Sequence, residues 1–241
     1  MRRLSGLLFT ALLVANTVAG SLWAVVLWPL PHRLRYFFAV RCWALANLWL
    51  LRVLCGVSWE ASGRENLPAG PCVVLMKHSS AFDTIVQTLL FPRQTWMLKR
   101  ELMFVPIFGW GLASMRAIGV DRARGPKGIR SVIRQGQARL RDEGLWVIVF
   151  PEGTRVAPGE VGHYAPGGAM IASAAACPVV PVAHNAGDHW PRRSATKQPG
   201  AIRIVIGRPL DSTGVGARKI TQEAKSWIEA EVRQIRSDKG I

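Results

Sequence analysis

The order of apolar and polar residues divides the chain into two parts. Residues 4–31 contain no charged side chain, and residues 34–57 are also mainly apolar, although arginines interrupt them. Farther along, short runs rich in valine and isoleucine alternate with stretches whose apolar residues recur at helical spacing. We therefore predict a membrane-associated segment over residues 1–57 and a globular domain over residues 58–241.

The first apolar segment is long enough to cross a membrane. As an α-helix, about 25 residues would extend about 37 Å, and the hydrocarbon core of a bilayer measures about 30 Å. A cleaved signal peptide is the alternative, because Arg2 and Arg3 precede the segment and residues 17–19 resemble a cleavage site. The apolar stretch is longer than the usual core of a signal peptide, which favours an anchor that stays in the protein.

The second apolar segment carries a basic face. Arg41 and Arg52 lie nearly three whole turns apart, so they share one side of a helix, where they can meet anionic lipid headgroups. Arginines also flank the first segment at both ends, so the positive-inside rule gives no orientation for a single crossing. Both observations favour a two-helix hairpin around residues 29–31, inserted from the cytoplasmic side of the inner membrane, over a complete span.

The globular part alternates predicted strands and predicted helices. The predicted strands are residues 72–76, 95–98, 117–120, 145–150, 179–183 and 202–206. The predicted helices are residues 84–90, 105–115, 127–142, 167–176 and 218–236. This alternation indicates an α/β fold with a mostly parallel central sheet flanked by helices.

Composition and charge narrow the functional classes. Apolar residues make up 49% of the chain, which excludes a disordered protein, and the net charge of +16 attracts an anionic partner. Nucleic acid, an anionic phospholipid membrane and a phosphorylated substrate all fit that charge. Five of the ten tryptophans fall within the first 59 residues, as is typical of membrane interfaces, so no nucleic acid is expected and nucleic-acid binding stays the minor alternative.

The first candidate for chemistry follows the predicted strand 72–76. His78 and Asp83 lie five residues apart, too far around a regular helix for their side chains to meet. They can touch if residues 78–82 form a tight turn and Asp83 opens the next helix. Asp83 would then fix the imidazole tautomer and leave the other ring nitrogen as a base. A helix-capping Asp beside a chance His is the alternative.

The second candidate follows the predicted strand 145–150. In the sequence Phe-Pro-Glu-Gly-Thr-Arg, turn residues bring the carboxylate of Glu152 and the guanidinium of Arg155 to one strand end. An arginine suits a phosphate because its planar fork donates two hydrogen bonds at once. A purely structural ion pair between Glu152 and a neighbouring base is the competing interpretation.

Together these motifs resemble the glycerolipid acyltransferase family. His78 and Asp83 match the family's H-x-x-x-x-D block, and residues 117–122, 150–155 and 179–182 match its further blocks in the family's order. The resemblance implies direct acyl transfer from an acyl-CoA or acyl-ACP thioester to a lysolipid hydroxyl, with no metal and no cofactor. His78 is then the general base and Asp83 the residue that orients it.

The resemblance also assigns substrate binding to a wider set of residues: Lys99, Arg122, Glu152, Gly153, Thr154, Arg155 and Pro181. Arg155 is expected to bind the phosphate of the acceptor, with Arg122 and Lys99 adding positive charge. The Glu152-Gly153 pair is expected to shape the polar pocket. Pro181 is expected to line the acyl tunnel.

The expected acceptor is 1-acyl-glycerol 3-phosphate (lysophosphatidic acid), acylated at its sn-2 hydroxyl to give phosphatidic acid. A lyso-ornithine lipid or another lysophospholipid is the alternative, because the same residues would serve. Many family members have Asn before the His, whereas this chain has Lys77.

Other chemistries are weaker alternatives. Ser79 or Ser80 could act as a nucleophile, and His184, Asp188 and His189 could form a metal cluster. Their irregular spacing favours polar loop residues instead. A catalytically inactive lipid-binding subunit is a further alternative, against which the intact His78 motif argues.

Overall fold

The computed structural model describes residues 2–238 and 240, and the side chain of Arg122 lies outside the described part. A seven-stranded sheet runs through the centre in the order β1-β7-β6-β2-β5-β3-β4. The strands are β1 (Val57–Ser62), β2 (Val73–Met76), β3 (Gln94–Lys99), β4 (Ile118–Val120), β5 (Trp146–Val149), β6 (Val179–His184) and β7 (Gly200–Ile206).

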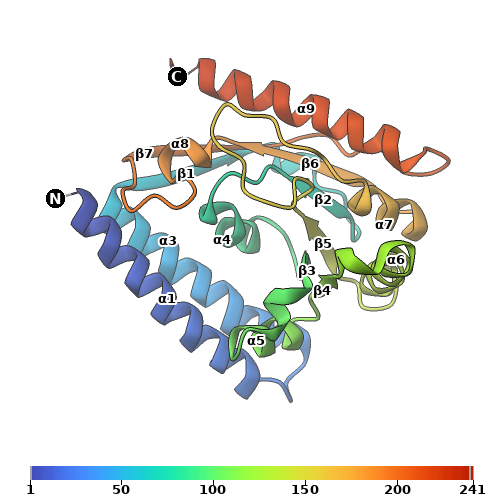
Figure 1. The fold of residues 1–241 in the computed structure, drawn as a ribbon, viewed down its shortest axis with the longest axis horizontal. Coiled ribbons are helices and arrows are strands. Elements are labelled where there is room, and N and C mark those ends of the chain that lie inside the picture. The colour runs from blue at the N-terminus through green and yellow to red at the C-terminus, as the bar shows by residue number, and fades with distance from the viewer. Residues whose placement is uncertain (1, 239, 241) are drawn as a thin grey trace.

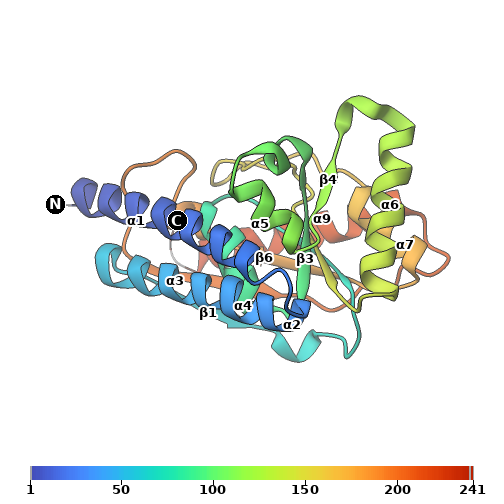
Figure 2. The same ribbon diagram turned by 90° about the horizontal axis from the view of Figure 1, so that it is seen from below.

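Helices cover both faces of this sheet, as Figures 1 and 2 show. One face packs against α1 (Arg2–Val26), α3 (Cys42–Cys55) and α4 (Ala81–Leu90). The other packs against α6 (Gly125–Arg141), α7 (Gly167–Ala175) and α9 (Ala217–Ser237). Among the pairs of strands that the structure describes, only β6–β7 is antiparallel. The predicted α/β fold with a mostly parallel sheet flanked by helices is therefore confirmed.

One strand was missed by the sequence pattern. The strand β1 lies at the edge of the sheet and pairs with β7, and its residues are mostly half-exposed or exposed. Its sequence, Val-Ser-Trp-Glu-Ala-Ser, lacks the continuous apolar run that marks a strand buried on both faces. The pairing with a strand about 140 residues later in the chain is long-range, so no local signal indicates it.

Two helices differ from their predicted bounds. The helix α4 begins at Ala81 because the Ser80 hydroxyl caps it, accepting from the Phe82 N–H. The predicted helix over residues 105–115 is shorter: the 3₁₀ helix η3 (Arg100–Phe104) leads into α5 (Phe108–Ser114). Between them Ile107 has φ +66°, a conformation outside helical geometry.

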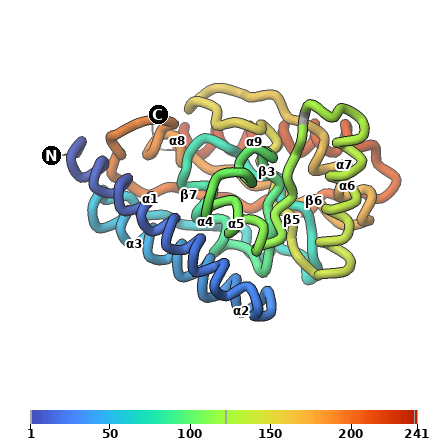
Figure 3. The backbone as a smooth tube through the Cα atoms, turned by 60° about the horizontal axis from the view of Figure 1, so that its bottom comes forward, coloured from blue at the N-terminus to red at the C-terminus, as the bar shows by residue number. Residues whose placement is uncertain are grey.

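The N-terminal segment forms the predicted hairpin of two helices. A turn after Val26 leads into α2 (His32–Arg35), a π-helical stretch η1 (Tyr36–Arg41) and α3. The two arms lie side by side (Figure 3), and the Trp43 indole N–H donates to the Thr17 hydroxyl at 3.2 Å. Both arms, Arg2–Val26 and His32–Cys55, are long and apolar enough to cross a membrane by length and composition.

The hairpin also packs on the globular part near both ends of α1. Phe9 is fully buried and meets the Trp190 ring edge-on, with ring centroids 5.2 Å apart. The Lys197 ammonium donates to the Thr10 hydroxyl at 2.8 Å. Near the other end of α1, a Cβ on Gly111 of α5 would lie 3.0 Å from Ser21. The α1 helix is thus held along the domain rather than projecting from it.

Truncating Phe9 tests this docking. Phe9→Ala removes a fully buried aromatic ring and leaves a cavity, so we expect the free energy of unfolding in detergent to fall by about 3 kcal/mol. Leu8→Ala is the matched control, since Leu8 is 50% exposed and its loss is expected to change stability by less than about 1 kcal/mol. Equal losses in denaturant titrations of the two variants would contradict the docking of α1 on the domain.

Candidate active site

The predicted site residues gather where the parallel strands end. The carboxyl ends of β2, β5, β3 and β4 share one edge of the sheet, and the end of β6 reaches the same edge. The loop after β5 folds back onto the loop after β2: the Val156 N–H donates to the His78 carbonyl at 2.9 Å. The Glu152 carboxylate accepts from the His78 backbone N–H at 2.7 Å. His78 is therefore held from both sides by the second motif.

The predicted contact between His78 and Asp83 is present. Asp83 is the third residue of α4 rather than its first, because Ser80 forms the cap. Its Oδ2 accepts from the backbone N–H groups of Ser79 and Ser80 at 3.0 and 2.9 Å. Its Oδ1 lies 3.1 Å from Nδ1 of His78. The turn that caps the helix thus also carries the imidazole to the carboxylate, so capping and positioning use the same residues.

Asp83 is the ionised partner of this pair. Burial alone would raise its pKa, but the positive charge that His78 can carry and the hydrogen bonds it accepts hold the pKa of Asp83 below its usual range. Oδ1 of the Asp83 carboxylate accepts a hydrogen bond from Nδ1–H of His78. In this tautomer Nε2 of His78 carries no proton and is the basic atom. The ring stacks on Phe150 with centroids 4.3 Å apart, and the His78 side chain stays 14% exposed. This arrangement can take a proton from a bound hydroxyl.

A second histidine, His184 at the end of β6, supports the pair from behind. Its Nδ1 accepts from the Ala186 N–H at 3.2 Å, and its Nε2 lies 2.8 Å from the Lys77 carbonyl, to which it donates. Both contacts are satisfied only by the neutral ring. Burial, the dominant effect, lowers the pKa of His184, even though Oδ2 of Asp83 lies 3.7 Å away. From the sequence, His184 is only a metal-ligand alternative, because nothing local links residue 184 to residue 83.

Glu152 lies in a buried ion pair. Its Oε1 is 2.7 Å from the Lys77 ammonium, and neither side chain is more than 4% exposed. Burial raises the pKa of Glu152, and Lys77 opposes that rise. The geometry therefore favours the interpretation of Glu152 as a partner in a structural ion pair.

The next residues of the motif form a turn toward solvent. Gly153 adopts φ +63°, which favours glycine, and its N–H donates to the Phe150 carbonyl. Thr154 is exposed and Arg155 is half-buried. Within the described part of the chain, the Arg155 guanidinium has no acidic partner, and its buried Nε makes no hydrogen bond. Arg155 is therefore available to an anionic ligand.

The other predicted basic residues lie farther along the same edge. Lys99 is exposed at the end of β3. Its neighbour Arg100 pairs with Asp121 at 2.6 Å, which tethers η3 to the loop after β4. Arg122, which follows, has its side chain outside the described part of the structure. No described contact joins Lys99 to His78, so these residues share an edge rather than one cluster.

Pro181 lies away from the other predicted residues. It is within β6, and a Cβ on Gly207 would lie 2.9 Å from its ring and 2.8 Å from Trp227 of α9. The Pro181 ring is therefore on the α9 face of the sheet. His78 instead stacks on Phe150, which packs against the core of the opposite face. The structure does not bring Pro181 to the His78 side.

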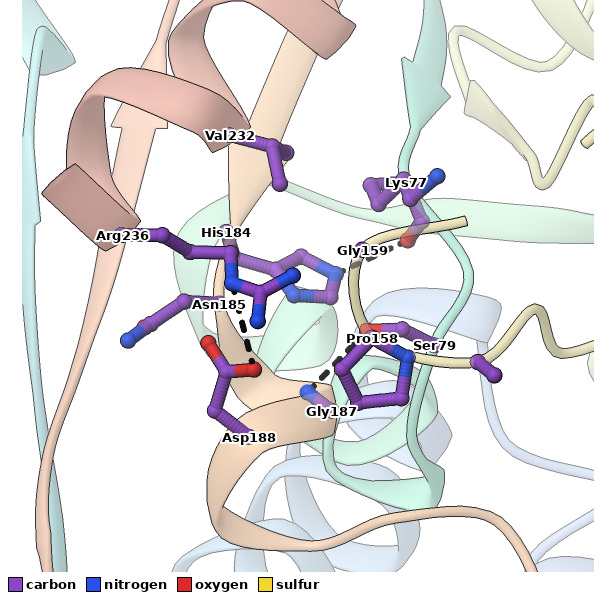
Figure 4. A pocket seen from close by; sticks show the side chains of 11 residues that line it. Lys77, Ser79, Pro158, Gly159, His184, Asn185, Gly187, Asp188, Val232 and Arg236 are labelled. Atoms are coloured by element: carbon purple, nitrogen blue, oxygen red, sulfur yellow. Dashed lines mark hydrogen bonds and ion pairs between the residues drawn. The ribbon is translucent and has the colours of Figure 1, made fainter. Parts of the chain in front are cut away.

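The residues of the weaker alternatives have separate structural partners (Figure 4). The Ser79 hydroxyl accepts from the Gly187 N–H at 3.1 Å, and the Ser80 hydroxyl caps α4. Asp188 pairs with Arg236 at 3.5 Å, and His189 lies 3.0 Å from the Gln198 carbonyl. The cavity between Ser79, Asp188 and Arg236 measures about 10 Å³, the space of one water molecule.

Comparison with known proteins assigns the chain to a family. The family model described as "Acyltransferase" matches residues 58–185. Over 232 residues the chain is 40% identical to the "1-acyl-sn-glycerol-3-phosphate acyltransferase" of Pseudomonas aeruginosa, and the alignment covers 95% of this chain and 90% of that protein. The chain belongs to the acyltransferase family.

More distant relatives agree with this assignment. The "1-acyl-sn-glycerol-3-phosphate acyltransferase" of Saccharomyces cerevisiae is 27% identical over 180 residues, which is 73% of this acyltransferase and 59% of the yeast protein. The crystal structure of the 1-acyl-sn-glycerophosphate acyltransferase PlsC from Thermotoga maritima matches with a TM-score of 0.78 at 20% identity, covering 98% of this chain and 96% of that one. The latter likeness shows the shared fold, including the two N-terminal helices.

The buried histidine predicts how the stability of this acyltransferase depends on pH. His184 is neutral in the folded protein and regains a pKa of about 6.5 only on unfolding, so its contribution is complete above that pH and is lost below it. Asp83, whose folded pKa is low, contributes stability above about pH 4 that is lost as the pH falls further. We expect the free energy of unfolding to fall from about pH 7 to about pH 5, before Asp83 titrates.

Denaturant titrations at each pH measure this dependence. His184→Gln keeps a donor and an acceptor but cannot titrate, so its curve should be flatter over that range. His163→Gln, at an exposed loop position, is the control and should keep the wild-type slope. If the free energy of unfolding of His184→Gln fell with pH as steeply as that of the wild type, groups other than His184 would cause the loss of stability in acid.

Proposed function

We propose that the protein transfers a fatty acyl group from an acyl thioester to the sn-2 hydroxyl of 1-acyl-glycerol 3-phosphate, producing phosphatidic acid. The relatives that cover most of this chain carry names for that reaction. The observation that carries the proposal is the imidazole of His78, held through Nδ1 by Asp83 at the sheet edge, with the half-buried Arg155 in the adjoining loop.

The chemistry needs one base and one anion site. Nε2 of His78 takes the proton of the acceptor hydroxyl as its oxygen attacks the thioester carbonyl. The C–S bond then breaks, and the imidazolium returns the proton to the leaving thiolate. Asp83 stabilises the imidazolium between these two steps. Bond making and bond breaking balance without a metal or a cofactor.

Arg155 is the residue that we assign to the acceptor phosphate. Its guanidinium has no carboxylate partner among the described residues, and a phosphate offers two oxygens to its planar fork. Lys99 adds positive charge at the same edge. Another lysolipid with a phosphate would fit these groups equally well, and either an acyl-CoA or an acyl-ACP would supply the thioester.

The two N-terminal helices support attachment to a membrane. Large apolar side chains of α1 and α3 are exposed, Trp49 to 63%. Monomeric soluble proteins rarely expose such continuous apolar surface. Because α1 is packed on the domain near both ends, the hairpin enters one leaflet of an anionic phospholipid membrane rather than spanning it. Carrier thioesters are made in the cytoplasm, so we assign the domain to the cytoplasmic face of the inner membrane.

Substitution of the base and of the anion site tests the reaction. With lysophosphatidic acid and either thioester donor, His78→Ala should lower kcat by at least about 100-fold, since general-base catalysis contributes about that much. Arg155→Ala should instead raise KM for the lysolipid about tenfold or more, because it removes a charge-assisted contact. Product formation from radiolabelled donor measures both effects.

The matched control is a histidine that takes no part in the proposed chemistry. His163→Ala, at an exposed position, should keep wild-type rates. Unchanged transfer by His78→Ala would contradict the base assignment. Acylation of a phosphate-free lysolipid in preference to lysophosphatidic acid would overturn the proposed acceptor and the role of Arg155.

A flotation experiment tests the membrane contact. Leu45 and Trp49 are exposed on α3, so Leu45→Ser with Trp49→Ser should shift the protein from floated anionic vesicles to the soluble fraction. Ile129→Ser replaces a 47% exposed apolar residue on α6 and should leave flotation unchanged. Equal flotation of all three proteins would refute the contact through α3.

A further inference from the structure

A second group of buried charges lies directly behind the catalytic pair. The Lys77 ammonium is 2.7 Å from Oε1 of Glu152 and 2.8 Å from Oε1 of Glu229. It also donates to the Glu160 carbonyl at 3.3 Å, and the Tyr164 hydroxyl donates to Glu229 at 2.8 Å. We call the side chains of Lys77, Glu152, Glu229 and Tyr164 the lysine cluster; the three charged side chains are at most 8% exposed.

The lysine cluster joins three distant parts of the chain. Lys77 directly follows β2 and precedes His78, Glu152 follows β5, and Glu229 lies in α9. The family match ends at residue 185, so the C-terminal helix reaches the site from outside the matched region. Within the cluster, Glu152 belongs to a recognised motif, whereas Lys77, Tyr164 and Glu229 lie outside those motifs.

Glu152 connects the cluster to the base. One carboxylate oxygen, Oε1, meets Lys77, while the other, Oε2, accepts from the His78 backbone N–H at 2.7 Å. A carboxylate accepts at both oxygens, whereas a protonated carboxyl has one oxygen that donates instead. Oε2 accepts from the His78 N–H most strongly when Glu152 is ionised, because a charge-assisted hydrogen bond is about twice as strong as a neutral one.

The charges around Glu152 favour that form only while Lys77 is present. Burial raises the pKa of Glu152, Lys77 lowers it, and the negative charge of Glu229 raises it again. The groups that face it are Lys77 from the loop after β2, the His78 N–H, and Glu229 with its Tyr164 partner. Removing the Lys77 ammonium would leave two buried carboxylates close together, and such a pair does not stay doubly ionised.

We propose, on the basis of the acyl-transfer function above, that Lys77 is a positioning residue: it holds the Glu152 carboxylate as the acceptor that fixes His78, and Glu229 of α9 holds Lys77 in place. This accounts for a lysine where many family members have asparagine, because here the lysine comes with a glutamate on the C-terminal helix. Lys77 touches neither the substrate nor the reacting atoms, and it acts through Glu152.

A double-mutant cycle tests whether Lys77 acts through Glu152. Lys77→Met should lower kcat about tenfold and change KM for the lysolipid less than about twofold. The substitution removes the cation that contacts Glu152, and residues of one ion-pair network are coupled by a free energy of this order. In a Glu152→Gln background the same substitution should change kcat by less than about twofold. Lys77→Arg should restore part of the rate, and Lys219→Met, an exposed lysine of α9, should match wild type.

The pH profile gives a readout that a purely structural role would not move. Lys77→Met should shift the acid limb of kcat to higher pH by about one unit, because Glu152 then takes up a proton more readily. Glu229→Gln removes a negative charge and keeps the oxygen that accepts from Lys77, so it should shift the limb to lower pH. A loss of packing alone would not shift the two variants in opposite directions.

The contrary results are distinct from failure of the proposed function. An equal loss of kcat from Lys77→Met in both backgrounds, or the same shift in both single variants, would refute the positioning role. Circular dichroism identifies a variant that has not folded; if Lys77→Met does not fold, Glu229→Gln carries the pH comparison, and an acid limb at the wild-type pH in that variant would refute the role. If wild type does not acylate lysophosphatidic acid but acylates another lysolipid, only the proposed acceptor fails, and the cycle is measured with that lysolipid.

Discussion

The site depends on one buried carboxylate. Asp83 has no exposed surface, and among the described side chains no lysine or arginine pairs with it. Two backbone N–H groups and the His78 ring satisfy it instead, so the charge is stable only in the turn that also starts α4. Because a single arrangement meets these demands, the fold of the loop after β2 and the tautomer of His78 are fixed together.

The charged residues of the site have two separate roles, one structural and one in binding. Glu152, which the motif suggested for substrate, is used to hold the His78 backbone and is neutralised from within by Lys77. The Arg155 guanidinium pairs with no carboxylate among the described residues, so it keeps its charge for a ligand. The charges of Lys77 and Glu152 are thus paired inside the protein, whereas Arg155 and Lys99 keep theirs at the edge where the proposed phosphate would bind.

The hairpin and the domain form one body. Contacts from Phe9 and Thr10 to the segment around Trp190 and Lys197 bind the first helix to the loop between β6 and β7. The apolar surface that remains exposed on α1 and α3 then has a fixed relation to the catalytic edge. A lysolipid is itself a membrane component, so the proposed attachment through the hairpin would bring the enzyme to its acceptor in the leaflet where the acceptor resides.

The sequence determined the helix–strand alternation, the two-helix hairpin and the His78–Asp83 pair, because each rests on local periodicity or on residues a few positions apart. The edge strand β1 escaped it, since a half-exposed strand acquires its partner only from a distant segment. The partners of Lys77, the neutrality of His184 and the position of Pro181 likewise came from tertiary structure alone. Each depends on which side of the buried sheet the side chain faces and on which distant carboxylate or carbonyl it contacts there. Neighbouring residues in the sequence do not determine these two things.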